Sequence, residues 1–294
     1  MSTPYLFAGA EIGGTKSIAL LAEGRTIIDS VTLPTGNADE TLAQLSAQLQ
    51  AWQAQRPFAA LGIASFGPLD LQRGQMLATP KPSWSGAPVL DRLREGLNCP
   101  VRIDTDVNGA ALAEYQWGAG IGCSSLCYVT IGTGVGGGFV IEGKPVHGAM
   151  HPEIGHLHLR RAPGDIFPGA CPFHGDCIEG LICGPALAER MGGNPAQVAD
   201  DDPRWQAVAS DLAEMMGAIL LTTSAQRILV GGGIGMARAS VLHLARQKVA
   251  ERFGSYLPFL DASSAEEIIR TPELGNDAGP LGAIALAQMA LAGA

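Results

Sequence analysis

The chain has 294 residues, 47% of them hydrophobic and 16% charged, and a net charge of −9. These values suit two domains with cores of ordinary size and exclude a largely disordered chain. The acidic balance and the lack of a basic stripe argue against a nucleic-acid partner, so a phosphate ligand has to be held locally. No apolar run approaches the roughly 18 residues of a membrane helix, and the N-terminal residues lack a signal-peptide pattern. We therefore expect a cytoplasmic protein with no membrane partner.

The first part of the chain alternates strand-like and helix-like segments. Residues 6–24 read as a hairpin with a glycine turn, and over residues 39–55 leucines and Trp52 recur at helical spacing. The other predicted elements are strands near 26–31, at 58–65 and at 101–104, and a helix over 107–117.

A second set of elements begins near residue 124. Residues 125–143 repeat the pattern of apolar strand, glycine turn and apolar strand, which indicates an internal duplication. Helices over 203–224, 237–253 and 279–292 follow, with a strand at 227–233 between the first two. We predict an α/β fold with mixed sheets and two domains, 1–118 and 119–294, with the last helix packing back on the first domain.

Four glycine-rich loops stand at the ends of these elements: EIGGTK at 11–16, IGTGVGGGF at 131–139, GGGIG at 231–235 and GNDAGPLGA at 275–283. Glycine lets a backbone approach a ligand closely, and successive amides can cradle phosphate oxygens. A single pair of glycines is more often a tight turn, and the spacing is not that of a P-loop. The four loops together favour nucleotide binding.

Three polar residues, Asp104, Asp106 and Asn108, alternate where a strand gives way to a helix. One of them suits a helix cap, but three exceed that need. A carboxylate at this point could accept the proton of an attacking sugar hydroxyl, and Asn108 could donate to and accept from a polyol.

A compact cysteine–histidine pattern, C-x-x-H-x-x-C, occupies residues 171–177. With one outside histidine it supplies four ligands for tetrahedral zinc, and four protein ligands close the shell of a structural site. The expected ligands are His156, Cys171, His174 and Cys177. His151 or His158 could replace His156, and packed thiols with surface histidines are the alternative to any metal. The remaining cysteines, at 99, 123, 127 and 183, read as packed thiols, and His147 and His243 as exposed or satisfied residues.

The order of these motifs, together with EIGH at 153–156, resembles the ROK family of sugar kinases and repressors from about residue 5 to the end. The resemblance implies a two-domain, actin-like ATPase (ribonuclease H-like) fold, with ATP, its Mg²⁺ and a sugar bound in the cleft between the domains. It also implies a homodimer.

The resemblance assigns roles to individual residues. It implies that Asp106 is the catalytic base. The implied sugar contacts are Asn108, Glu153, His156 and Glu179. The implied ATP contacts are Gly13, Gly14, Thr15, Lys16, Gly132, Thr133, Gly134, Gly136, Gly232 and Gly233.

The chain departs from the common family pattern in three places. Glu11 replaces an aspartate, the usual Asn-Asp-Ala-Asn stretch is Thr105-Asp106-Val107-Asn108, and His174 replaces a cysteine of the metal cluster. Glu11 leaves open how magnesium is held. Glu11 and the histidine-containing cluster, with SFGPLD at 65–70 and TPKPSW at 79–84, are similar to the bacterial fructokinase branch. That branch implies phosphoryl transfer to the C6 hydroxyl of fructose. Mannose, glucose and N-acylhexosamines are the alternative substrates.

Two other classes of protein compete with a kinase. A sugar-responsive repressor would carry a helix-turn-helix domain before the first hairpin, where only about ten residues precede Glu11. A sugar-binding protein without catalysis is disfavoured by the retention of Asp106 and of four glycine loops.

Overall fold

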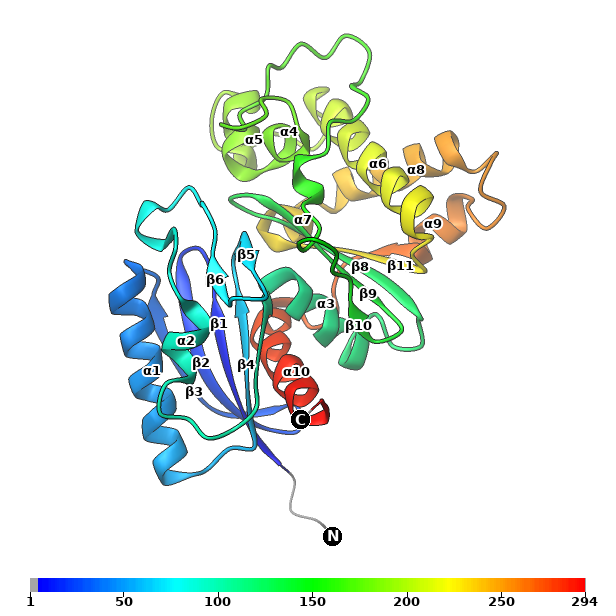
Figure 1. Cartoon of the computed structure of the whole chain (residues 1–294). Helices are drawn as coiled ribbons and strands as arrows, with labels where there is room; N and C mark the ends of the chain where they lie inside the picture. Colours follow the sequence, from blue (N-terminus) through cyan, green and yellow to red (C-terminus); the bar gives the residue numbers. More distant parts are fainter. Residues whose placement is uncertain (1–4, 294) are drawn as a thin grey trace. The chain divides into compact units, whose positions relative to one another are not determined.

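The structure, a computed structural model, describes residues 5–293 apart from the side chains of residues 234–236, and its chain forms two units (Figure 1). Unit 1 comprises the chain up to Gly118, Lys144–His151 and the segment from Leu274 onward. Unit 2 comprises Ala119–Gly143 and Pro152–Glu273. The final helix therefore belongs to the same unit as the N-terminal hairpin.

Unit 1 is built on a mixed sheet in the order β3-β2-β1-β4-β7. Strand β1 (Leu6–Ile12) pairs antiparallel with β2 (Lys16–Glu23) and parallel with β4 (Ala60–Ser65). Strand β7 (Val101–Thr105) continues the sheet parallel to β4, and β3 (Thr26–Pro34) closes its other edge. Because β1, β4 and β7 are parallel, their carboxyl ends meet at one edge of the sheet.

Helices cover both faces of this sheet (Figure 1). Helix α1 (Ala38–Gln55) packs the apolar side chains predicted from its helical spacing against one face. Helix α10 (Ala278–Ala292) packs against the other face and against α3 (Asp106–Trp117). A Cβ on Gly62 of β4 would lie 1.9 Å from the carbonyl oxygen of Ala283, so only glycine allows α10 to approach this closely.

The other elements of unit 1 are short. They are β5 (Leu69–Asp70), β6 (Gln75–Met76), β10 (Lys144–Pro145), α2 (Val89–Arg94) and two 3-10 helices at Pro82–Trp84 and Gly275–Asp277.

Unit 2 repeats the arrangement of a hairpin beside a parallel strand, in the order β9-β8-β11-β12. Strand β8 (Ser125–Ile131) pairs antiparallel with β9 (Val135–Ile141) and parallel with β11 (Arg227–Gly231). Helices α6 (Arg204–Thr223) and α8 (Ala239–Phe253) pack together (Figure 1). The other elements are β12 (Ile269–Arg270), α4 (Ile178–Ile182), α5 (Gly184–Met191), α7 (Gly232–Ala237), α9 (Ala262–Ile268) and 3-10 helices at Ile154–His156 and Pro195–Gln197.

The predicted elements occur in the predicted order, with shifted ends. The largest difference follows Gly231, where the strand ends and a separate short helix, α7, precedes α8. Among the described residues, no helix combines the length and the apolar character that crossing a membrane requires.

Candidate active site and metal centre

The turn between β1 and β2 presents unbonded amides in unit 1. Each of its carbonyl groups has a donor: Thr35 Oγ1 donates to Gly13 O (2.9 Å), the ammonium of Lys81 to Gly14 O, and Thr35 N to Thr15 O (3.0 Å). Within residues 5–293, by contrast, the N–H groups of Gly14 and Thr15 have no acceptor. A turn that offers free donors and no free acceptors is suited to an anion.

Two carboxylates lie at the ends of the parallel strands beside this turn. Burial raises the pKa of Asp106, the first residue of α3, to about 6, although the Val107 amide donates to its Oδ1 (2.8 Å). Burial, and secondly the charge of Asp106, raises the pKa of Glu11 on β1 to about 7, and Lys16 opposes this shift. Carboxyl groups that titrate near neutrality are suited to accept a proton at working pH.

A buried polar pair, Asp104 and Asn108, stands at the same edge and is joined by His147. Asn108 Nδ2 donates to Asp104 Oδ1 at 2.7 Å, and both residues are fully buried. His147 Nε2 lies 2.9 Å from Asp104 Oδ2 and 3.3 Å from Asn108 Nδ2. Within the described part of the chain, Asn108 Oδ1 is buried without a hydrogen-bond partner, so it is available to a ligand hydroxyl.

One expectation about this segment is corrected. The helix cap is neither an aspartate nor an asparagine: Thr105 caps α3 and accepts from Asn108 N at 3.2 Å. His147, expected to be exposed or satisfied, is satisfied by Asp104 and Asn108, which lie 43 and 39 residues away in the chain. No local pattern could have joined them.

In unit 2, the turn between β8 and β9 has the same arrangement as the turn between β1 and β2. Gly184 N donates to Gly132 O (2.7 Å), and Gly132 N donates to Gly134 O (2.9 Å). The amides of Thr133 and Gly134 have no acceptor among residues 5–293. Each hairpin thus ends in a turn with two unbonded N–H groups.

Some glycines in these loops leave open space. A Cβ on Gly14, Gly132 or Gly233 would meet no atom within 4 Å, and these three glycines belong to three different loops. The protein's own packing therefore gives no reason for glycine at these positions, which agrees with a ligand approaching there.

Other glycines in the same loops are explained by packing. A Cβ on Gly137 would lie 2.2 Å from Ile154 Cδ1, so the close approach of the Ile154 side chain accounts for glycine at this residue. A Cβ on Gly282, in the fourth loop, would lie 2.4 Å from the backbone of Gly109, where α10 crosses α3. Gly232 has φ +80° and approaches the Ile131 backbone. Gly136 lies in β9, paired with Thr130.

The four expected metal ligands gather in unit 2. The ligand atoms of His156, Cys171, His174 and Cys177 all lie within 4.8 Å of one another. His156 Nδ1 is 3.9 Å from Cys171 Sγ, 3.6 Å from Cys177 Sγ and 3.3 Å from His174 Nδ1. Zinc bonds of about 2.0–2.3 Å place tetrahedral ligand atoms roughly 3.3–3.8 Å apart, so the cluster fits zinc. Burial raises the pKa of the Cys177 thiol to about 11, and a coordinated metal ion would remove that proton.

The two alternative histidine ligands have other partners. His151 is buried in unit 1, where its Nε2 accepts from Leu69 N at 3.0 Å. His158 Nε2 donates to the carbonyl oxygen of His174 at 3.0 Å, and so supports the cluster's backbone.

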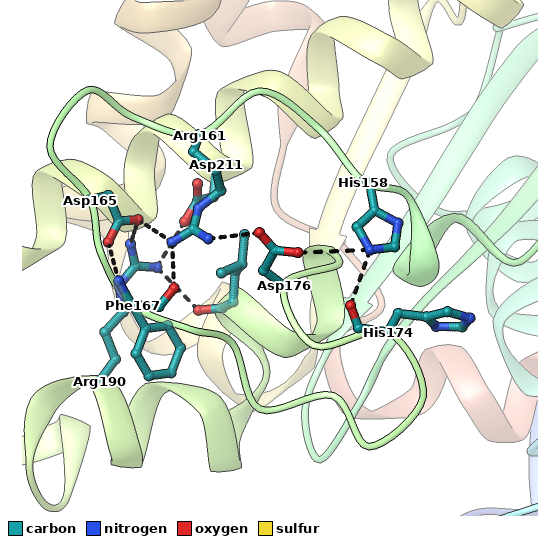
Figure 2. Close-up of polar contacts among 9 residues, drawn as sticks. His158, Arg161, Asp165, Phe167, His174, Asp176, Arg190 and Asp211 are labelled. Atoms are coloured by element: carbon teal, nitrogen blue, oxygen red, sulfur yellow. Dashed lines mark hydrogen bonds and ion pairs between the residues drawn. The ribbon is translucent and has the colours of Figure 1, made fainter.

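A network of ion pairs anchors the loop that carries the cysteine–histidine cluster (Figure 2). Asp176, inside the loop, accepts from Arg161 at 3.0 Å, and Arg161 also bonds Asp165 at 2.8 Å. Arg190 of α5 binds both Asp165 and Asp211 of α6. The side chains of Arg190 and Asp211 are only 4% and 1% exposed, so removal of either one would leave the other as an unpaired buried charge. The loop is therefore tied to two helices of unit 2.

Glu179 links the metal cluster to the second glycine turn. It follows Cys177 by two residues, on α4, and its Oε1 lies 4.0 Å from Cys171 Sγ. Its Oε2 accepts from Val135 N at 3.0 Å. Glu153 is exposed and precedes the 3-10 helix that carries His156. Unit 2 thus carries three of the implied sugar contacts, Glu153, His156 and Glu179, and unit 1 carries Asn108.

Comparison with known proteins identifies the class. The ROK family model matches residues 7–290, and the chain belongs to the ROK family. The crystal structure of a ROK hexokinase from Thermus thermophilus is 27% identical, with a TM-score of 0.76, covering 98% of this chain and 100% of that one. The expected actin-like ATPase fold with mixed sheets is therefore confirmed.

More similar relatives carry a narrower name. A fructokinase of Zymomonas mobilis is 41% identical over 296 residues, which cover 96% of each protein. A fructokinase of Pediococcus pentosaceus is 34% identical over 294 residues, covering 97% of this chain and 99% of the relative.

Proposed function

We propose that this protein is an ATP-dependent hexose kinase, and that its hexose is fructose. The observation that carries the proposal is the placement of Asp106, whose pKa burial raises to about 6, in the same unit as a turn with two unbonded amides. A base for a hydroxyl and a cradle for phosphate are the two parts that phosphoryl transfer needs. The names of the relatives support fructose over other hexoses.

The reaction follows from the roles of these groups. The C6 hydroxyl oxygen of the sugar attacks the γ-phosphorus of ATP, an O–P bond forms, and the bond from that phosphorus to the β,γ-bridging oxygen breaks. Asp106 accepts the hydroxyl proton, and the electron pair of the broken bond leaves on ADP. The amides of Gly14, Thr15, Thr133 and Gly134 would stabilise phosphate oxygens as fixed donors. Asn108 Oδ1 would accept from a sugar hydroxyl, and Glu153, His156 and Glu179 are the other proposed sugar contacts.

The residues near the first turn fit a magnesium ion. Glu11 Oε2 is buried without a hydrogen-bond partner in the described part of the chain, and burial raises the pKa of this carboxyl to about 7. A carboxylate in such a position gains from a hard cation that accepts oxygen ligands. We propose Glu11 as a magnesium-binding residue. The ion would supply positive charge to phosphate oxygens.

The cluster of His156, Cys171, His174 and Cys177 fits structural zinc. Four protein ligands leave no open position for catalysis, so its role would be to fold the loop that precedes Glu179. A cytoplasmic location, where ATP is available, belongs to the same proposal, and the homodimer implied by the family stays a prediction.

Coupled ADP-release assays across fructose, mannose, glucose and N-acetylmannosamine test the function. We expect the highest kcat/KM with fructose. Asp106→Asn should lower kcat by roughly 10²–10⁴-fold, as general-base loss typically does, and leave sugar affinity within several-fold. Asp91→Asn, a change on an exposed side chain of α2, is the matched control. A variant at position 106 with more than about a tenth of wild-type kcat would rule out Asp106 as the base.

A further inference from the structure

One motif, TPKPSW at 79–84, has no role in the proposed reaction. Its backbone is firmly held: Trp84 is fully buried, packs edge-on against Phe66 with ring centroids 5.1 Å apart, and donates its indole N–H to Gly36 O at 2.9 Å. Prolines at 80 and 82 fix φ on both sides of Lys81. The motif is thus a rigid base from which one long cationic side chain extends.

That side chain ends at the first glycine turn. The Lys81 ammonium donates to the carbonyl oxygen of Gly14 and lies 5.6 Å from the centroid of the Phe66 ring. Among the described residues, no carboxylate is within ion-pair distance of Lys81, so its charge is directed at the turn. The chain contains only four lysines, and two of them are associated with this turn: Lys16 follows it as the first residue of β2, and Lys81 donates to it.

The contact fixes the direction of one amide. The Gly14 carbonyl and the Thr15 N–H belong to the same peptide group, which is trans, so the two bonds point in opposite directions. An ammonium that holds the carbonyl on one side therefore aims the Thr15 N–H to the other, where it has no acceptor. A cation on the carbonyl also polarises the peptide and strengthens its N–H as a donor.

On the Gly14 side, packing does not hold the peptide in one orientation. Gly14 is exposed, and a Cβ there would meet nothing within 4 Å, so the contact with Lys81 is what fixes the Gly14 carbonyl. We propose that Lys81 is a positioning residue that orients the Gly14–Thr15 peptide so that the Thr15 N–H donates to a phosphate of ATP. This inference rests on the proposed function, because it requires nucleotide phosphate at the turn.

Calorimetry with the non-hydrolysable analogue AMP-PNP and with fructose tests the inference on the full chain. Lys81→Met should bind AMP-PNP roughly 10–100-fold more weakly, the equivalent of one hydrogen bond to a charged group, and bind fructose within about threefold of wild type. Lys81→Arg keeps a cationic donor and should restore most of the affinity. Lys248→Met, on α8 in unit 2, removes the same charge elsewhere and should change neither affinity.

A spectroscopic measurement separates a change in the orientation of the Gly14–Thr15 peptide from a general loss of structure. With ¹⁵N-threonine labelling, the Thr15 amide resonance of the wild type and of Lys81→Arg should move downfield on addition of AMP-PNP, and that of Lys81→Met should not. Unchanged AMP-PNP affinity in Lys81→Met, or equal loss of AMP-PNP and fructose affinity, overturns the inference alone. Failure of the wild type to bind AMP-PNP at all overturns the proposed function instead.

Discussion

The proposed metal cluster gives the most demanding prediction, because its loss should raise the KM for the sugar more than the KM for ATP. Cys177→Ser removes one of four ligands whose atoms lie within 4.8 Å of one another. Cys177 immediately precedes α4, which carries Glu179, a proposed sugar contact. Loss of groups that orient a site typically costs 10–100-fold, so the fructose KM should rise by roughly that factor.

Cys177→Ser should raise the KM for ATP by a smaller factor, through a hydrogen bond that Glu179 makes beside the second glycine turn. Glu179 Oε2 accepts from Val135 N at 3.0 Å, directly after the second glycine turn. Complete loss of this charge-assisted bond would cost about 1.5–3 kcal/mol, an upper bound of roughly 10–150-fold in affinity. Ile178 and Leu181 anchor α4 in the core, so we expect only part of that loss and a rise in ATP KM below about tenfold.

The assay combines elemental analysis with two KM measurements. The wild type should carry one zinc per chain, and Cys177→Ser should carry none. Cys183→Ser is the matched control, since it makes the same substitution at a buried cysteine outside the cluster. Wild-type protein without zinc, or a fructose KM in Cys177→Ser equal to that of Cys183→Ser, would refute the reasoning.

Two further predictions concern the nucleotide and the base. Gly132→Ala should fold with a wild-type melting temperature, because its Cβ would meet no atom within 4 Å, but should weaken AMP-PNP binding by roughly tenfold or more, since an added methyl would occupy the phosphate cradle. Calorimetry against Gly293→Ala, at the end of α10, measures this, and equal affinities would contradict the cradle. The kcat/KM for fructose should fall as pH drops through about 6, because a protonated Asp106 cannot accept a proton. A pH–rate profile that stays flat down to pH 5 would contradict this assignment.

Local pattern was sufficient for the longer elements and for the compact motifs, but it did not predict the shorter helices α2, α4, α5 and α9. Helical spacing of apolar residues predicted α1, and alternating glycine turns predicted both hairpins, because each signal lies within a few residues of the structure that it specifies. The three proposed ligands within residues 171–177 could be picked out for the same reason, and the structure brings their side chains together. His156 was the harder choice among three histidines, and the tertiary fold places it, and neither His151 nor His158, at the cluster.

Sequence patterns were insufficient wherever the role of a residue depends on a contact with a residue far away in the chain. Gly137 and Gly14 look alike in sequence, yet the Ile154 side chain packs closely against Gly137, and a Cβ on Gly14 would face open space. His147 has no local signal, and its bonds to Asp104 and Asn108 exist only because the segment after β10 returns to the end of β7. Such contacts depend on chain topology, which composition and periodicity do not encode.

The two hairpins present the same backbone arrangement, but each is held by different groups. In both turns two amides have no acceptor among the residues that the structure describes, and different groups hold the turns in place. In unit 1 the ammonium of Lys81 and the hydroxyl of Thr35 hold the carbonyls of the turn. In unit 2 a backbone amide, Gly184 N, holds the carbonyl of Gly132. The carboxylate of Glu179, which follows a metal ligand by two residues, fixes the next amide. The first turn should therefore respond to charge at position 81 and the second to the state of the metal cluster, because each is fixed by a group that the other lacks.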